Sequence, residues 1–230
     1  NALTPIEKQI ANSRQLALKV TCNSIYGFTG VKQGLLPCVP IAKSVTYIGR
    51  GMIDDSKEYA ENIENFPELK NYKYVCETGE QLNINYACEV CYGDTDSIFC
   101  KFDVSSLDDH PEFERIKYSM EIGHIVADKI TKYLISKNKT SRSFARWTKL
   151  EFEKVYGRLF LFSKKRYIGP LYEFDSKKPS YIDKKGVVSG RRDNCIFTVD
   201  IYAGSTDRLM KKIDNKSEIP NMIQEAIVFA

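Results

Sequence analysis

The sequence predicts a mixed α+β fold, with an antiparallel sheet and helices packed around it. Long segments carry apolar residues at helical spacing, and shorter segments between them are rich in β-branched and aromatic residues. A Gly-Asp-Thr-Asp turn at 93–96 separates two of the short segments, which is typical of a β-hairpin. The chain has 230 residues, 43% of them hydrophobic, and this is enough to form a core.

Two helices are expected at the start of the chain. The first, at 4–26, begins with Thr4 as its N-cap, Pro5 at the first helical position and Glu7 completing a capping box. Two glycines end it. The second, at 42–63, is entered after two prolines and closed by an Asn-Phe-Pro breaker.

The remaining elements follow in order along the chain. Strands are predicted at 72–76, 86–92, 97–102, 147–155, 159–169 and 181–189. Helices are predicted at 111–137, 198–213 and 219–229. The second and third strands flank the Gly-Asp-Thr-Asp turn, so they form the predicted hairpin.

Basic residues are concentrated in one part of the chain. The net charge is only +4, but the stretch 139–192 holds fifteen Lys or Arg and five Asp or Glu. That stretch carries a net charge of +10, and the rest of the chain carries −6. Such polarity is typical of polyanion binding, with a solvated charged face as an equal alternative.

The seven cysteines are an odd number at irregular spacing, and no secretion signal precedes them. This favours reduced thiols in an intracellular protein. Cys88 and Cys91 form a single Cys-x-x-Cys pair, but a zinc site normally needs a second pair or nearby histidines. We therefore expect buried free thiols at both positions, with a structural metal as the weaker alternative.

No run of about 18 apolar residues predicts a membrane span. The chain starts without Met and stops within an apolar run at Phe229-Ala230. Natural termini are usually polar, so we expect the sequence to be cut from a longer protein.

The Tyr-Gly-Asp-Thr-Asp-Ser segment at 92–97 has two carboxylates at the predicted hairpin tip. Asp94 and Asp96 lie two residues apart, where their like charges repel each other. A divalent cation would remove that cost, and hard oxygen ligands favour magnesium or manganese. Gly93 lets a substrate approach the backbone closely. An ordinary polar turn is the alternative, because Asp and Gly are common turn residues.

Polar residues form a stripe on the first predicted helix. Lys19, Asn23 and Tyr26 lie four and three residues apart, so they share one helical face, and Gln15 extends it by a turn. A cation, an amide and a phenol suit a triphosphate and a base. Gly27 has no Cβ, so a base pair can come close to the helix end. A solvated helix face is the alternative.

Four segments, in this order, resemble motifs of the family B DNA polymerases, in particular the delta-type and large-DNA-virus branches. They are Lys-x-x-x-Asn-Ser-x-Tyr-Gly at 19–27, Tyr-Gly-Asp-Thr-Asp-Ser at 92–97, Leu-Glu-Phe-Glu-Lys-Val-Tyr at 150–156 and Lys-Lys-Arg-Tyr at 164–167. Arg-Arg-Asp-Asn at 191–194 resembles the family's palm–thumb junction. The resemblance covers nearly the whole chain.

The resemblance implies a catalytic role for three residues: Asp96, Asp94 and Lys19. Asp96 would ligate both catalytic metal ions, and Asp94 would be an intermittent partner. Glu153 would be an accessory carboxylate near the metals, with an exposed acidic strand face as the alternative. The metal ions would be two Mg²⁺, with Mn²⁺ as an alternative. They would support two-metal phosphoryl transfer from a dNTP to a primer 3′-hydroxyl.

The resemblance also implies residues that bind nucleotide and DNA. Lys19 and Asn23 would contact the triphosphate, while Tyr26, beside Gly27, would check the minor groove of the new base pair. The residues expected to contact the primer–template are Thr95, Lys164, Lys165, Arg166, Tyr167 and Arg191. Lys165, Tyr167 and Arg191 are the preferred candidates, because Arg166 and Arg192 have acidic residues such as Asp193 as alternative partners.

The implied domain organisation has three parts. Residues 1–66 would form fingers helices and their return to the palm, 67–195 the palm, and 196–230 the start of the thumb. The implied partners are primer–template DNA, dNTP and, in the full-length protein, a sliding clamp or accessory subunits, with no membrane. The implied compartment is the nucleus or a viral replication compartment.

Several parts of the family pattern are missing from the chain. The upstream Asp-x-x-Ser-Leu-Tyr-Pro-Ser motif, the exonuclease carboxylates and the earlier fingers helix are not in it. We therefore expect the chain alone to be unable to polymerise DNA. One alternative is a non-catalytic palm–thumb relic that binds DNA, but such a relic is expected to have lost Asp96 or Lys19. Another is a reverse transcriptase or RNA polymerase, to which the motifs at 19–27 and 164–167 do not belong.

Overall fold

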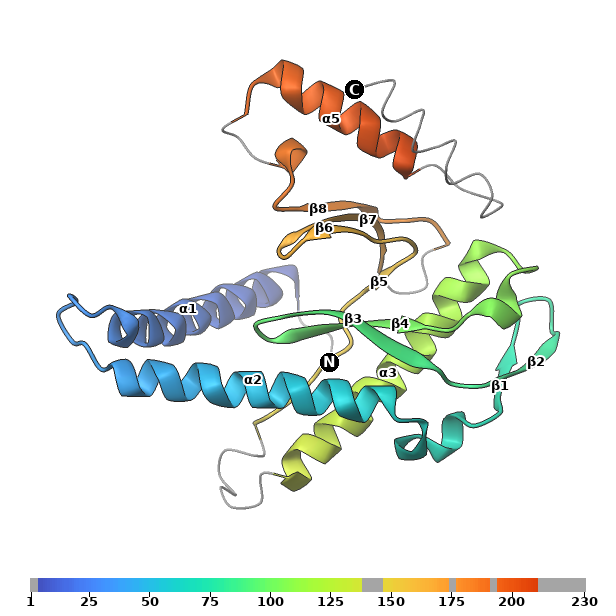
Figure 1. The fold of residues 1–230 in the computed structure, drawn as a ribbon, viewed down its shortest axis with the longest axis horizontal. Coiled ribbons are helices and arrows are strands. Elements are labelled where there is room, and N and C mark those ends of the chain that lie inside the picture. Colours follow the sequence, from blue (N-terminus) through green and yellow to red (C-terminus); the bar gives the residue numbers. More distant parts are fainter. Residues whose placement is uncertain (1–3, 138–146, 174–176, 191–193, 211–230) are drawn as a thin grey trace.

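The computed structural model of the protein describes residues 4–137, 147–173, 177–190 and 194–210. Within them, four α-helices and three small antiparallel sheets form a mixed α+β fold. Two long helices, α1 and α2, lie side by side and project from the body, while α5 lies on the other side of the strands β6–β8 (Figure 1). None of the described helices is long and apolar enough to span a bilayer.

The helix α1 (Pro5–Gly30) begins as the sequence predicts. The Thr4 side chain accepts from the Glu7 N–H, and the Glu7 carboxylate accepts from the Thr4 N–H at 2.8 Å, which completes the capping box. The helix runs to Gly30, so the predicted end at residue 26 is one turn too early. The helix α2 (Val39–Glu61) starts three residues before the predicted 42, because Pro40 falls in its first turn, where no backbone N–H is required.

Two β-hairpins follow α2. The first pairs β1 (Tyr72–Val75) with β2 (Gln81–Ile84), and β2 is a strand that the sequence analysis did not predict. The second pairs β3 (Cys88–Asp94) with β4 (Ser97–Phe102), which confirms the predicted hairpin. A bulge between Val90 and Tyr92 interrupts the register of β3.

A four-stranded antiparallel sheet is built around β7 (Arg166–Tyr172). This strand pairs with β5 (Val155–Tyr156), β6 (Phe160–Ser163) and β8 (Tyr181–Lys185). The predicted single strand at 159–169 is wrong: it is two strands joined by a turn at 164–165. The predicted strand at 181–189 ends early, at Lys185, and is followed by a 3-10 turn at Val188–Gly190.

The predicted strand at 147–155 is also wrong except at its last residue. Residues 148–154 have no strand assignment, because they cross α3 (Glu112–Lys137) instead of joining a sheet. The Thr131 hydroxyl of α3 donates to the Leu150 carbonyl at 3.0 Å and accepts the Leu150 N–H at 2.9 Å. The Phe152 ring lies against Gly123, where a Cβ would be 2.5 Å from it.

The helix α3 is the centre of the core. Its buried residues pack on one side with the end of α2 and both hairpins, through side chains such as Phe66, Tyr74 and Tyr86. On its other side, Ile116 and Met120 pack with Tyr172 of β7. The last described helix, α5 (Ile196–Leu209), corresponds to the helix predicted at 198–213, and the helix predicted at 219–229 lies outside the described residues.

Candidate active site

The tip of the β3–β4 hairpin is a tight and strained turn. Asp94 pairs with Ser97, so only Thr95 and Asp96 form the loop. Thr95 has a φ of 54°, which is a rare conformation for a β-branched residue. The Asp94 carbonyl holds this loop by accepting the Asp96 N–H at 2.6 Å and the Ser97 hydroxyl at 3.2 Å. Such strain persists only where the surroundings impose it, and it is concentrated at functional sites.

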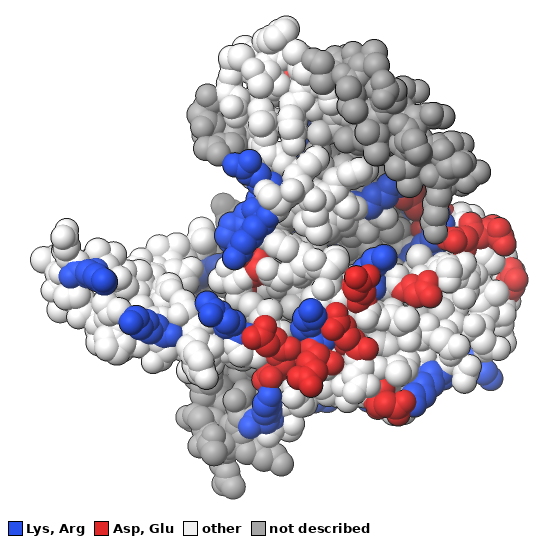
Figure 2. All heavy atoms as spheres, in the orientation of Figure 1, with Lys and Arg blue, Asp and Glu red and all other residues white. Residues whose placement is uncertain are grey.

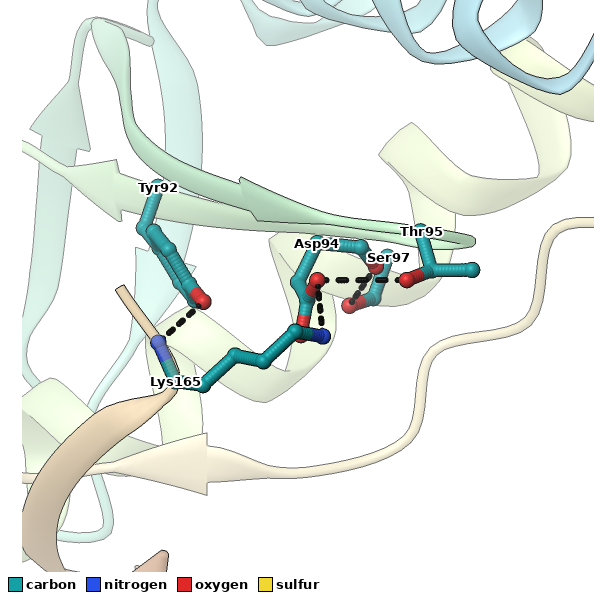
Figure 3. Close-up of polar contacts among 5 residues, drawn as sticks. All are labelled: Tyr92, Asp94, Thr95, Ser97 and Lys165. Atoms are coloured by element: carbon teal, nitrogen blue, oxygen red, sulfur yellow. Dashed lines mark hydrogen bonds and ion pairs between the residues drawn. The ribbon is translucent and has the colours of Figure 1, made fainter. Parts of the chain in front are cut away.

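A second turn, between β6 and β7, docks on this tip (Figure 3). The Lys165 ammonium lies 2.6 Å from Asp94 Oδ1 and 2.7 Å from Oδ2. The Lys165 N–H donates to the Tyr92 hydroxyl at 2.8 Å. Lys165 itself has a φ of 63°, and Gly186, with no Cβ, makes room for its carbonyl oxygen. Two motifs far apart in the sequence are therefore joined by one lysine.

The ion pair between Asp94 and Lys165 shifts the pKa of both groups. The hydrogen bond from Lys165 is the main cause that lowers the pKa of Asp94 below its ordinary value. The same hydrogen bond raises the pKa of Lys165. Both groups are therefore charged at neutral pH, and the Asp94 carboxylate also accepts from the Thr95 hydroxyl at 3.1 Å.

Four aromatic rings, which we call the aromatic cluster, support the docked turns. They are Tyr92 and Phe99 from the hairpin and Tyr156 and Tyr167 from the four-stranded sheet. Phe99 lies 5.4 Å from Tyr167 and 6.1 Å from Tyr156, measured between ring centroids. Tyr167 was predicted to contact DNA; its ring is half-buried in this cluster, and its contact with DNA stays a prediction.

The predicted cations lie around the turn between β6 and β7. Lys164, Lys165 and Arg166 are exposed. Figure 2 shows basic side chains over this part of the molecule and acidic ones over the C-terminal half of α2. Arg191, also predicted to bind DNA, and Arg192 and Asp193 lie outside the described residues.

The predicted nucleotide stripe lies on α1. Lys19, Asn23 and Tyr26 are all exposed, and a Cβ on Gly27 would meet no atom within 4 Å. The stripe is therefore accessible to a ligand. That Lys19 faces Asp96 across a gap of nucleotide width stays a prediction.

Comparison with known proteins decides the family. The sequence profile described as DNA polymerase family B matches residues 1–229. The chain belongs to DNA polymerase family B. It is 38% identical over 206 residues to the DNA polymerase delta catalytic subunit of Mesocricetus auratus, which covers 90% of the chain and 16% of that protein.

Other family B relatives show the same coverage. The delta catalytic subunits of Oryza sativa and Plasmodium falciparum are 36% and 35% identical over 223 and 230 residues. These matches cover 97% and 100% of the chain and 17% of each relative. The chain thus spans about a sixth of the length of these family B polymerases.

The described carboxylates of this family B chain do not gather into a metal site. Asp96 is exposed at the hairpin tip, whereas Asp94 is engaged by Lys165. Glu153 is exposed and pairs with Lys154 at 3.4 Å. Among the described residues, no group of three or more His, Cys, Asp or Glu is placed to hold a metal ion. The role of Asp96 as a metal ligand stays a prediction.

The Cys-x-x-Cys pair has another structural explanation. Cys88 and Cys91 both lie on β3, but Cys91 falls at the bulge and has no register partner on β4. Cys88 is half-buried and Cys91 is exposed, so the expectation of a buried thiol is wrong for Cys91. All seven cysteines are free thiols.

Sequence reasoning missed the residues that join the sheet to the hairpin. It did not single out Phe99 or Tyr156, although both lie in or beside recognised motifs. It did not foresee that the Tyr92 hydroxyl binds the Lys165 backbone. The one available indication was the aromatic content of 12%, which does not say which rings meet.

Proposed function

We propose that the chain is part of a DNA-directed DNA polymerase that adds nucleotides from dNTP to a primer 3′-hydroxyl. The observation that carries this proposal is the docking of the cationic turn on the strained tip that presents Asp96. An exposed carboxylate on the tip and exposed cations on the docked turn support contact with a primer end and its phosphates. The family and the identity to delta catalytic subunits support it.

Phosphate binding is assigned to the turn and its neighbours. Lys164 and Arg166 are exposed beside Lys165 and can neutralise phosphate charge on the primer strand. Thr95, at the tip, would lie against the primer end. Arg191 and Tyr167 are further DNA contacts in this proposal. Such contacts fix the register of the duplex without selecting its sequence, so template pairing selects the nucleotide.

Nucleotide binding is assigned to α1. Lys19 would hold the triphosphate as a point charge, and Asn23 would donate to a phosphate oxygen. Tyr26 would lie along the minor groove of the new base pair, with Gly27 leaving room for it. Because these residues stand on a single helix, they would move together if α1 rotates against the body.

Mg²⁺ is the ion that the carboxylate chemistry suits. Asp96 would hold it, with Glu153 and, through a shared solvation shell, Asp94 nearby. When bound, the ion supplies charge neutralisation at the transferred phosphate and lowers the pKa of the attacking hydroxyl. Asp96 itself contributes an exposed carboxylate on the hairpin tip.

The wider setting of the proposal is replication. Residues 1–66, 67–195 and 196–230 would be fingers, palm and the start of the thumb. The full-length protein would act on primer–template DNA with accessory subunits or a sliding clamp, in the nucleus or a viral replication compartment.

Replacement of Asp96 tests the proposal. In the full-length polymerase that contains this chain, Asp96→Ala should abolish incorporation, by about a thousandfold or more, because one transition-state ligand is lost. Binding to a primer–template duplex should persist, because the cationic turn is intact. Primer extension and fluorescence anisotropy measure the two properties separately.

Asp109→Ala is the matched control, since Asp109 is exposed on the connection before α3. It should extend primers like the wild type. Undiminished synthesis by Asp96→Ala would contradict the assignment of Asp96 as a metal ligand. A wild-type protein that does not bind the duplex would contradict both the polymerase and the DNA-binding relic.

A further inference from the structure

A buried carboxylate lies outside the residues assigned so far. Asp183 of β8 is only 4% exposed. Its Oδ2 accepts the Tyr156 hydroxyl at 2.6 Å. Lys154 Nζ lies 3.6 Å from Oδ2, and Lys185 Nζ lies 3.4 Å from Oδ1. A buried charge is costly unless it is paired and hydrogen-bonded, and here one acid faces two cations and a phenol.

The position of Asp183 is set by the sheet. It stands opposite Gly169 on β7, and Tyr167 stands opposite Lys185. A Cβ on Gly169 would lie 3.0 Å from the Tyr156 ring, so the absence of a side chain there leaves space for that ring. The tyrosine therefore crosses the sheet over Gly169 and reaches the carboxylate.

Tyr156 connects this carboxylate to the hairpin. Its ring stacks on Phe99 of β4, with an interplanar angle of 13°, and meets Tyr167 edge-on at 80°. Phe99 in turn lies 5.2 Å from the Tyr92 ring, whose hydroxyl binds the backbone of Lys165. Contacts thus run without a break from Asp183 to the docked turn.

The tyrosine is a permanent donor to the acid. Burial, and then the hydrogen bond to Asp183, raise the pKa of the Tyr156 hydroxyl far above its ordinary value. Burial alone would lower the pKa of Lys154, but the charges of Glu153 and Asp183 outweigh this and raise it. Both partners therefore keep their protons at neutral pH.

We infer that Asp183 is a positioning residue for nucleotide transfer: by holding Tyr156 it fixes the carboxylate hairpin against the cationic turn. This inference rests on the proposed function. If Asp183 is lost, the Tyr156 ring is no longer tied at its polar end, and Phe99 loses a fixed partner. The hairpin tip then shifts relative to Lys165, and Asp96 shifts relative to the primer end.

The effect of such a shift is on turnover rather than on nucleotide affinity. A displacement of the reacting groups lowers kcat, because transition-state geometry is lost, while the nucleotide stripe on α1 is untouched. We expect Asp183→Ala and Tyr156→Phe in the full-length polymerase to lower kcat per active site by about tenfold or more. We expect KM for dNTP to change by less than about twofold.

The conservative variant Asp183→Asn separates positioning from charge. Its amide oxygen still accepts the Tyr156 hydroxyl, so it should recover most of the kcat that Asp183→Ala loses. The double variant Asp183→Ala/Tyr156→Phe should be no worse than either single variant, because both remove the same contact. Tyr181→Phe, an exposed tyrosine of β8, is the matched control and should behave as the wild type.

Pre-steady-state incorporation with active-site titration measures these constants, and the thermal midpoint is recorded for each variant. If Asp183→Ala does not fold, Tyr156→Phe, which removes one hydroxyl group, decides the question alone. An unchanged kcat per active site in Tyr156→Phe, or a failure of Asp183→Asn to recover activity, would overturn the inference. A wild-type polymerase that does not incorporate nucleotide would instead contradict the proposed function itself.

Discussion

Asp94 and Asp96 are two residues apart, yet their surroundings assign them different tasks. Asp94 is held by both oxygens against Lys165, and its pKa is lowered by that contact. Asp96 is exposed beyond it on the loop. At the scale of single residues, the hairpin tip therefore has one carboxylate that is held in an ion pair and one that is exposed to solvent.

Replacement of Asp94 should therefore differ from replacement of Asp96. In the full-length polymerase, Asp94→Asn removes the charge that neutralises Lys165, so we expect duplex affinity to be retained or increased. The slope of log affinity against log salt should steepen by about one, because one more cation is available to phosphate. Incorporation should slow, because the turn is no longer fixed.

The dependence of the rate on Mg²⁺ separates the two roles of Asp94. We expect the half-saturating Mg²⁺ concentration of Asp94→Asn to stay within about twofold of the wild type, since Asp94 is engaged by a lysine. Lys164→Ala is the control for a lost phosphate contact and should weaken duplex binding. A tenfold or larger shift in the Mg²⁺ requirement would show that Asp94 is a ligand.

At the scale of elements, α3 is the helix against which both hairpins and the four-stranded sheet pack. It contacts the segment before β5 closely enough that Gly123 has the Phe152 ring in place of a Cβ. It also holds the β1–β2 hairpin through buried Glu114, which accepts the Tyr74 hydroxyl at 2.6 Å and the Glu77 N–H at 2.9 Å. Through these contacts, both sides of the core pack against the same helix.

Two glycine substitutions test the packing on α3. Gly123→Ala should destabilise the protein by about 1–3 kcal/mol, because the new methyl group collides with Phe152. Gly51→Ala, in the middle of α2 where an added Cβ would meet open space, should stabilise it by about 0.5–1 kcal/mol through helix propensity. Denaturant midpoints of the 230-residue chain measure both. Equal effects of the two substitutions would contradict the packing.

Glu114 should make stability depend on pH. Burial alone would raise its pKa, but the bonds from Tyr74 and Glu77 outweigh burial and hold the pKa below the ordinary 4.5. Because the folded pKa is the lower one, the stabilisation is present above the unfolded value and is lost as pH falls through the folded value. Glu114→Gln should cost about 1–3 kcal/mol at neutral pH.

The measurement is the thermal midpoint of wild type and Glu114→Gln across the acid range. The difference between them should be constant near neutrality and shrink as pH falls from the unfolded pKa of about 4.5 through the lower folded pKa. A difference that does not change with pH would show that ionisation of Glu114 contributes nothing.

At the scale of the whole molecule, the helical hairpin has an unusual surface. Along α1 and α2, apolar side chains such as Leu16, Leu18, Ile25, Val45 and Ile48 are more than half exposed, and α1 has no buried residue. The chain spans about a sixth of its relatives. Exposed apolar surface of this extent is typical of a face that packs against another protein segment.

The isolated 230 residues should therefore bind DNA without copying it. We expect no template-directed incorporation with any divalent ion, because the described part of the chain has no group of three or more acidic, His or Cys residues placed to hold a metal ion. We expect duplex binding that weakens as salt increases, because exposed Lys164 and Arg166 remain. Primer extension and anisotropy on the same preparation measure both, and detectable incorporation would refute the expectation.

The sequence by itself determined the fold class, the capping of α1, the β3–β4 hairpin and the family motifs. These features depend on neighbouring residues: a cap needs Thr4 and Glu7 three apart, and a hairpin needs a turn between two apolar runs. The exposed stripe on α1 follows from helical spacing in the same way. Each of these features depends on residues that are close together in the sequence, so it can be predicted without coordinates.

Only the tertiary structure decided what Asp94, Phe152 and Asp183 do. The segment before β5 has the composition of a strand, yet Thr131 and Gly123 of α3 bind it, so it joins no sheet. The segment 159–169 has the composition of one strand, yet it turns at Lys165, where Gly186 leaves room for the Lys165 carbonyl oxygen. The Lys165 side chain then reaches Asp94. Each outcome depends on a partner distant in the sequence, and spacing along the chain carries no information about such a partner.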